Sequence, residues 1–374
     1  MFHDLFRGKN VFITGHNGFK GSWLTAWLVS LGAEVFGYSL EPKPHEVLFD
    51  LLRLGESLKR DGRGDIRDAG ALSEAILSSQ PDYIFHLAAQ PLVRASYRKP
   101  KETFETNVLG TVNLLEALIG YPKRCSVVVV TTDKCYENKE WLHAYREEDP
   151  MGGYDPYSAS KGCAELVTAA YRSSFFSESD SLIKVASARA GNVIGGGDWA
   201  PERIVPDIVR SVKSGEPVSV RNRQATRPWQ HVLEPISGYL WLAAHLGTPE
   251  ICGYEPMLFC SAFNFGPQLE SNRTVSQLVE SFLKHTGGNW IDASNPTEPH
   301  EASRLNLSID KAYHMLRWKP TWSFEACVQQ TANWYQSVQN GFDPKAATQG
   351  CIARYVEDAT RLNQAWTQAQ VFAD

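Results

Sequence analysis

The sequence has no hydrophobic run long enough to cross a membrane, although 43% of its 374 residues are hydrophobic. A transmembrane helix needs about 20 consecutive apolar residues, and polar residues interrupt every such stretch here. The opening residues MFHDLFRGKN also lack the basic and apolar segments of an export signal. Positive charge is scarce as well, because a net charge of −5 gives no general attraction to nucleic acid or anionic lipid. We therefore expect neither a membrane nor a nucleic acid as a partner.

Cysteine is present only in scattered positions. The seven cysteines form no CxxC pair and no zinc-type spacing with histidine. We therefore expect no metal site, reduced thiols and a cytoplasmic protein. The remaining composition, with 21% charged residues and a mean hydropathy of −0.30, is typical of a soluble globular enzyme.

The chain contains a regular alternation of strand-like and helix-like segments. Apolar runs predict strands, and apolar residues at helical spacing predict helices. The expected strands cover residues 11–15, 34–38, 83–89 and 126–132, and the expected helices cover 22–32, 69–79 and 104–119. Such alternation implies right-handed βαβ crossovers. It predicts an α/β fold with a doubly wound, parallel Rossmann sheet.

A glycine motif directly follows the first expected strand and opens the first helix. Gly15, Gly18 and Gly21 form GxxGxxG, where a dinucleotide pyrophosphate needs close backbone approach and free N–H donors. An ordinary tight turn is the alternative interpretation. After the second strand, Glu41 is placed to reach a ribose, which favours NAD, while Lys43 leaves a 2′-phosphate open.

Tyr157 and Lys161 form a YxxxK pair, which a helix places on one face. A lysine ammonium beside a phenol favours phenolate, so we expect the pKa of Tyr157 to be lowered toward neutrality. Tyr157 would then act as a base for an alcohol proton. A solvated helix pair is the alternative, but the glycine motif upstream favours the catalytic interpretation.

Three longer motifs carry a family resemblance. The segments GHNGFKGSW, TTDKCYEN and GNVIGGGDWA resemble those of the CDP-D-glucose 4,6-dehydratases, within the extended short-chain dehydrogenase/reductases of the NAD-dependent epimerase/dehydratase family. The resemblance extends from Asn10 to about Pro320. Thymidine-linked glucose dehydratases carry Thr-Asp-Glu where this chain has Thr132, Asp133 and Lys134. The choice of cytosine as the base rests on the resemblance alone.

The resemblance implies a role for each catalytic candidate. Thr132 would hydrogen-bond the sugar 4-oxygen, Asp133 would protonate the departing 6-hydroxyl, and Lys134 stands where the base for the carbon-5 proton is expected. Tyr157 would be the acid/base at carbon 4, with Lys161 as its electrostatic partner and ribose ligand. Alternatively, Lys134 stays protonated and stabilises the enolate, while Glu137 or Tyr157 takes the carbon-5 proton. A turn aspartate beside a surface lysine is the non-catalytic interpretation.

The resemblance also implies the binding residues. The NAD ligands would be Gly15, Gly18, Phe19, Gly21, Asp65, Ile66, Ala88, Ala89, Tyr157 and Lys161. The candidates for the substrate diphosphate and ribose are Asn192, Arg203, Arg227 and Arg304, because guanidinium engages phosphate bidentately. For any single arginine, a surface salt bridge is an equally good interpretation.

The regular alternation ends at Ala190, and a long glycine-rich loop is expected over residues 191–203. We therefore expect an NAD-binding Rossmann domain with the catalytic residues at 1–190. Residues 191–374 would be mainly a smaller sugar-nucleotide-binding lobe, with a strand near 259–266 returning to the main sheet.

The expected reaction converts CDP-D-glucose to CDP-4-keto-6-deoxy-D-glucose. A nucleotide-sugar 4-epimerase and a non-catalytic dinucleotide sensor are the competing hypotheses. Relatives commonly form homodimers or homotetramers, and such products usually feed dideoxysugars of bacterial surface polysaccharide.

Overall fold

The computed structural model describes residues 1–43, 47–248, 255–294 and 304–368. Its centre is a parallel sheet of seven strands in the order β11-β6-β5-β4-β1-β2-β3. These strands are β1 (Asn10–Thr14), β2 (Glu34–Ser39), β3 (Arg60–Arg63), β4 (Tyr83–His86), β5 (Cys125–Val130), β6 (Ile183–Ala190) and β11 (Ala262–Phe265). The predicted α/β Rossmann class is confirmed. No helix of the described residues is long and apolar enough to span a bilayer.

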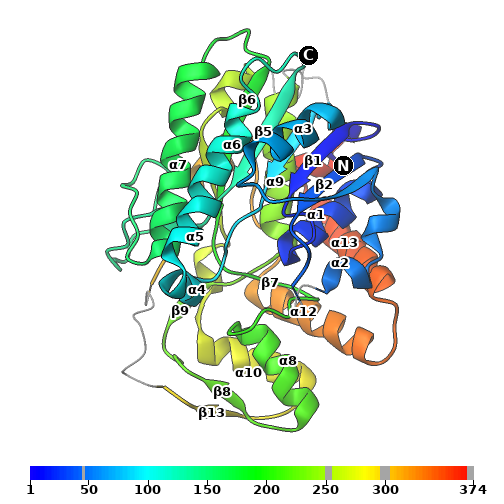
Figure 1. The fold of residues 1–374 in the computed structure, drawn as a ribbon. Helices are drawn as coiled ribbons and strands as arrows, with labels where there is room; N and C mark the ends of the chain where they lie inside the picture. The colour runs from blue at the N-terminus through cyan, green and yellow to red at the C-terminus, as the bar shows by residue number, and fades with distance from the viewer. Residues whose placement is uncertain (44–46, 249–254, 295–303, 369–374) are drawn as a thin grey trace.

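Helices cover both faces of this sheet (Figure 1). In β5, Val127 and Val129 pack into one core and Val128 and Val130 into the other, because successive side chains of a strand point to opposite faces. One face is covered by α3 (Ala69–Ser79), α6 (Gly110–Glu116) and α7 (Pro156–Phe175). The other is covered by α1 (Phe19–Ser30) and α9 (Leu233–Gly247); α13 (Pro344–Arg361) packs against α1, and α12 (Phe324–Gln339) packs against α13. Both faces are therefore apolar, which explains the continuous apolar runs of the strands.

A smaller group of elements lies beyond the carboxyl edge of the sheet. Figure 1 shows α8 and α10 beside the strands β8 and β13 at the lower end of the molecule. The elements of this part are β7 (Val193–Ile194), α8 (Ile204–Ser214), β8 (Val218–Val220), β9 (Thr226–Pro228), β10 (Gln230–His231), β12 (Asn272–Thr274), α10 (Val275–Thr286) and β13 (Trp290–Asp292). The strands among them form three two-stranded sheets, β7 with β10, β9 with β12 and β8 with β13. The division of the chain at residue 190 stays a prediction.

The remaining helices are short connections or late additions. They are α2 (Leu48–Leu51), α4 (Val93–Arg98), α5 (Pro100–Phe104) and α11 (Asp310–Leu316). The helix expected over 104–119 is a chain of α5, a π-helical turn at Glu105–Leu109 and α6. The strand expected near 259–266 is present as β11, which pairs in parallel with β6. Residues 295–303 lie outside the described residues.

Aromatic side chains tie the first residues of the chain to the last described ones. The rings of Phe2 and Trp366 stack with centroids 5.1 Å apart, and Trp27 of α1 meets both rings edge-on. Tyr355 of α13 also stacks on Trp366, with ring centroids 5.8 Å apart. Rings of this size bury a large apolar area each. The two ends therefore close the core on the α1 side of the sheet.

Candidate active site

A cavity of about 920 Å³ opens at the carboxyl edge of the sheet, where parallel α/β folds bind ligands. It extends across the strand ends from β3 to β6, which are five strand spacings, or about 24 Å, apart. Every predicted site residue except Arg304 lines it. The lining set is Gly15, Gly18, Phe19, Gly21, Asp65, Ile66, Ala88, Ala89, Thr132, Asp133, Lys134, Tyr157, Lys161, Asn192, Arg203 and Arg227.

The glycine loop is packed as a dinucleotide site requires. Gly15 has φ +74°, and a Cβ there would lie 2.7 Å from the Ala88 nitrogen. A Cβ on Gly21 would meet the Gly15 carbonyl at 2.0 Å, so the first turn of α1 can approach the loop only without a side chain. Gly18 is the N-cap of α1 and borders the cavity. The N–H groups of this helix end therefore suit a pyrophosphate, and the chain fits NAD here.

The β2 and β3 ends form the other part of the cofactor half. Asp65 is held by Arg67, whose backbone N–H and Nε each donate to the carboxylate at 2.9 Å, and this contact lowers the Asp65 pKa. Ile66 is buried against Gly110. Asp68 caps α3, which is compatible with the expected adenine site next to it. Glu41 lies on the cavity wall, as its position after β2 suggested.

The turn after β5 places Thr132 and Asp133 in the cavity as a connected pair. A 3-10 turn at Asp133–Cys135 begins at Thr132, whose hydroxyl donates to Asp133 Oδ1 at 2.9 Å. Asp133 Oδ2 is buried and has no hydrogen-bond partner among the described residues. Burial raises the pKa of Asp133, while the neighbouring cation of Lys134 opposes the shift. A buried carboxyl with a raised pKa and an open oxygen is suited to donate a proton.

The expected lowering of the Tyr157 pKa by Lys161 is wrong for the protein without a cofactor. Burial raises the pKa of Tyr157 to about 12, while a hydrogen bond with Thr132 and the cation of Arg203 act in the other direction. Lys161 Nζ donates instead to the carbonyl of Val130 at 3.2 Å, and burial lowers its pKa to about 8. The helical spacing did bring both side chains to the cavity. Spacing alone could not reveal the desolvation of the phenol.

The two candidates for the carbon-5 base occupy different places. Lys134 is half-buried and lines the cavity directly beside Asp133. Glu137 is exposed, forms a 3.5 Å ion pair with Lys139 and does not line this cavity. The geometry therefore favours Lys134 over Glu137 as the group next to the sugar.

Lys20 is a cavity residue that sequence reasoning missed. It stands inside the glycine motif, and its Nζ donates to the hydroxyl of Tyr239 in α9 at 3.2 Å. Burial and the nearby cations of Lys161 and Arg203 lower the pKa of Lys20 to about 7. A lysine within a loop that approaches a cofactor was the available signal.

The substrate candidates divide into a cluster and an outlier. Asn192 and Arg203 border the cavity, and Arg203 is paired with Asp198 at 2.9 Å. Arg227 in β9 lies close enough to Asp133 to oppose its raised pKa. Arg304 is exposed, and its carbonyl accepts from Asn138 Nδ2 at 3.0 Å. The described structure thus does not bring Arg304 to the other three.

A buried polar network supports the catalytic turn from behind. Glu165 of α7 accepts from Arg189 at 2.8 Å, from Ser187 at 2.7 Å and from the Thr131 hydroxyl. Arg189 also donates to the hydroxyl of Tyr136, the residue that ends the turn, at 2.8 Å. These contacts join α7, β6 and both sides of the Thr132–Asp133–Lys134 segment. They hold the turn because every buried partner would otherwise lose a hydrogen bond.

Comparison with known proteins assigns the family. A family model described as GDP-mannose 4,6 dehydratase matches residues 12–331. The chain belongs to the GDP-mannose 4,6 dehydratase family. Among curated proteins, the chain is 45% identical over 364 residues to a CDP-glucose 4,6-dehydratase of Salmonella typhimurium. The match covers 96% of this chain and 99% of the relative.

Solved structures agree with this family fold. A dTDP-glucose 4,6-dehydratase from Streptomyces venezuelae, solved with NAD bound, is similar with a TM-score of 0.73 at 24% identity, over 90% of this chain and 99% of that one. A UDP-glucose 4-epimerase from Thermotoga maritima has a TM-score of 0.74 at 22% identity, over 88% and 99%. Because dehydratases and an epimerase share the fold, the residues of the cavity must decide between the two reactions.

Proposed function

We propose that this member of the GDP-mannose 4,6 dehydratase family is an NAD-dependent CDP-D-glucose 4,6-dehydratase, which makes CDP-4-keto-6-deoxy-D-glucose. The Salmonella relative, similar over nearly the whole length of both chains, supports the nucleotide and the sugar. The single observation that carries the reaction type is the open, buried carboxyl of Asp133 beside Lys134. A 4-epimerase has no use for an acid and a second base beside the hydroxyl donor.

The glycine loop of Gly15, Gly18 and Gly21 would hold NAD, which would supply the hydride chemistry that links carbon 4 and carbon 6 of the sugar. Tyr157 takes the proton of the 4-hydroxyl, and Thr132 hydrogen-bonds the resulting carbonyl oxygen. Because burial raises the pKa of this phenol, the step needs positive charge nearby; Arg203 already opposes the raised pKa, and the family resemblance assigns the same role to Lys161.

The elimination uses the pair that follows β5. Oxidation at carbon 4 acidifies the proton at carbon 5, which Lys134 removes. Asp133 donates its proton to the 6-hydroxyl, which leaves as water. The raised pKa of Asp133 keeps the carboxyl in its acid form at higher pH than an exposed aspartate.

The substrate half of the cavity supplies the anchoring groups. Asn192, Arg203 and Arg227 would hold the CDP diphosphate, and the guanidinium groups match phosphate oxygens. Arg304 stays a candidate only if the sugar nucleotide draws its segment inward. We further propose that the protein works in the cytoplasm as a homodimer or homotetramer and that its product feeds dideoxysugars of surface polysaccharide.

Incubation of the purified protein with CDP-D-glucose and NAD tests the proposal. We expect a 4-keto-6-deoxy product with no net reduction of NAD, detected by mass spectrometry and by the alkaline absorbance of the keto sugar. CDP-galactose as the product would identify an epimerase. An unchanged substrate despite bound NAD would identify a non-catalytic dinucleotide sensor.

A further inference from the structure

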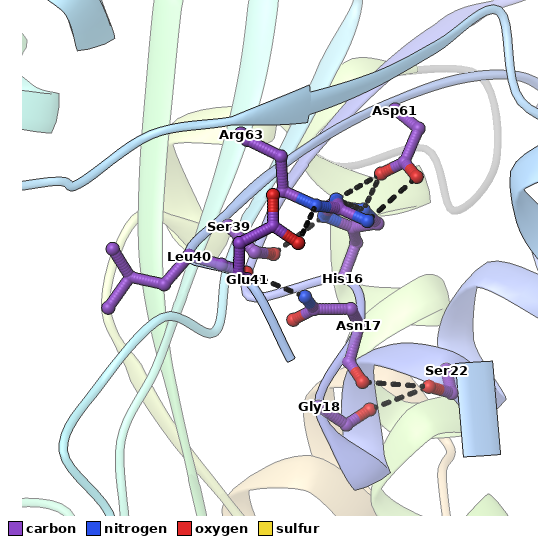
Figure 2. Close-up of polar contacts among 9 residues, drawn as sticks. All are labelled: His16, Asn17, Gly18, Ser22, Ser39, Leu40, Glu41, Asp61 and Arg63. Atoms are coloured by element: carbon purple, nitrogen blue, oxygen red, sulfur yellow. Dashed lines mark hydrogen bonds and ion pairs between the residues drawn. The ribbon is translucent and has the colours of Figure 1, made fainter. Parts of the chain in front are cut away.

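The last residue of β2 is not acidic, although an acidic side chain usually binds the adenosine ribose at this place. In dinucleotide folds an acidic residue at this place hydrogen-bonds the 2′-hydroxyl, whereas an arginine accommodates a 2′-phosphate. Here β2 ends at Ser39, and its hydroxyl is 2.7 Å from His16 Nδ1. The first carboxylate after β2 belongs to Glu41, on the cavity wall. Asn17 donates to the Leu40 carbonyl at 2.8 Å and so fixes the chain just before Glu41 (Figure 2).

The cation beside Glu41 comes from the next strand. Arg63 of β3 is paired with Ser39 in the sheet, and its Nε is 3.4 Å from Glu41 Oε2. Both terminal nitrogens of Arg63 bond to the carboxylate of Asp61, with NH2 at 2.8 Å from Oδ2. Figure 2 shows the guanidinium between the two carboxylates. The planar donor fork that would suit a phosphate is therefore occupied by Asp61.

The charge balance of this group disfavours another anion. Glu41 and Asp61 carry two negative charges against one positive charge on Arg63. His16, which also contacts Asp61 at 2.7 Å, adds no cation near neutrality because burial lowers its pKa. Lys43 lies on the same wall and is the further cation that a 2′-phosphate would meet. With Lys43 counted the corner is neutral, so removal of a carboxylate should leave a net positive charge that favours a bound anion.

We propose that Glu41 and Asp61 together set the cofactor preference, by holding Arg63 away from the ribose 2′ position and by repelling a 2′-phosphate. The inference rests on the proposed use of NAD and names the residues that exclude NADP. Asp61 acts through Arg63 and is thus a positioning residue.

Calorimetric titration of cofactor-stripped protein with NAD and with NADP provides the test. The wild type should bind NAD more tightly. Glu41→Gln and Asp61→Asn should each lower the ratio of the NADP to the NAD dissociation constant at least about threefold, as exposed charge pairs allow, and the double variant at least about tenfold. Addition of Arg63→Met to the double variant should restore the wild-type ratio of the two dissociation constants. The shift should shrink in 0.5 M salt, where screening is stronger.

Glu34→Gln is the matched control, because Glu34 begins the same strand and is paired with Lys59 at 3.0 Å, far from the cavity. It should leave the ratio unchanged. An unchanged ratio in the double variant, or a gain that survives Arg63→Met, overturns the inference. Should Asp61→Asn fail to fold, Glu41→Gln decides alone, since its side chain is exposed. If the wild type binds neither cofactor, the proposed function fails together with this inference, whereas bound NAD with an unmoved ratio rejects this inference alone.

Discussion

Asp133 is the residue on which the choice of reaction depends. Asp133→Asn keeps the shape and the contact with Thr132 but removes the acidic proton. We expect dehydration to slow by about 10²- to 10⁴-fold while oxidation at carbon 4 continues, so that reduced nicotinamide accumulates. Stopped-flow absorbance with CDP-D-glucose measures both steps. Near-wild-type turnover without that absorbance would show that Asp133 is not the acid.

The raised pKa of Asp133 also predicts a pH profile. The carboxyl can donate only while it is protonated, so dehydration should slow as pH rises through the raised pKa. The rate of dehydration in a single turnover, followed by product formation from pH 5 to pH 9, measures this falling limb of the pH profile. We expect the limb to disappear in Asp133→Asn; a limb that persists there belongs to another group.

Lys134 is the second residue that separates two mechanisms. If Lys134 is the carbon-5 base, Lys134→Met abolishes solvent-deuterium exchange at carbon 5 while oxidation at carbon 4 stays detectable. Lys134→Glu should recover part of the activity, because a carboxylate can take the same proton. Nuclear magnetic resonance of the recovered sugar measures the exchange. Exchange that persists in Lys134→Met but is lost in Glu137→Gln would move the base to Glu137, despite its exposed position.

Glu234 fixes how α9 meets the segment before α12. The fully buried carboxylate accepts from the backbone N–H groups of Thr321 and Trp322 at 2.9 and 2.7 Å and from the Tyr355 hydroxyl at 2.7 Å. Burial raises the Glu234 pKa to about 7. The folded state keeps this proton where the unfolded chain has lost it, so the contribution of Glu234 to stability is full below pH 4.5 and declines as pH rises to about 7.

Glu234→Gln should remove that decline. The free energy of unfolding of the variant minus that of the wild type should increase by about 2 kcal/mol from pH 5 to pH 8. Urea denaturation at each pH measures this difference. Glu325→Gln, an exposed substitution in the first turn of α12, is the matched control for the loss of one carboxylate. A difference that stays constant with pH would show that Glu234 is ionised throughout this range.

The sequence patterns predicted which strands and helices exist better than they predicted the residues at which these elements end. The helix over 69–79 was found at its exact limits, because Asp68 caps it and apolar spacing marks its buried face. The strand expected to run to Ala89 ends at His86, since residues 87–89 leave the sheet and line the cavity. An apolar run does not mark that change. Motifs predicted many of the cavity residues but missed Lys20 and included Arg304, which does not line the cavity. The Tyr157 pKa was not predictable, because the burial of this side chain depends on residues far along the chain.

At the scale of the whole molecule, the aromatic stack between the chain ends should contribute strongly to stability. Trp366 is fully buried and stacks with Phe2 and Tyr355. Trp366→Ala should lower the free energy of unfolding by about 3 to 5 kcal/mol, because it leaves a large cavity. Leu362→Ala, on a side chain that is 46% exposed, should change it by less than about 0.5 kcal/mol. Denaturant titration of both variants measures the difference, and equal losses would argue against a packing role for Trp366.

The same stack has a consequence for biosynthesis. The ribosome releases Phe2 and Trp27 early, but Trp366 follows only after more than 300 further residues, on the order of tens of seconds later. During that interval the aromatic surface of α1 lacks its final cover. The nascent chain therefore exposes this apolar surface for most of its synthesis, and exposed apolar surface of this kind favours aggregation.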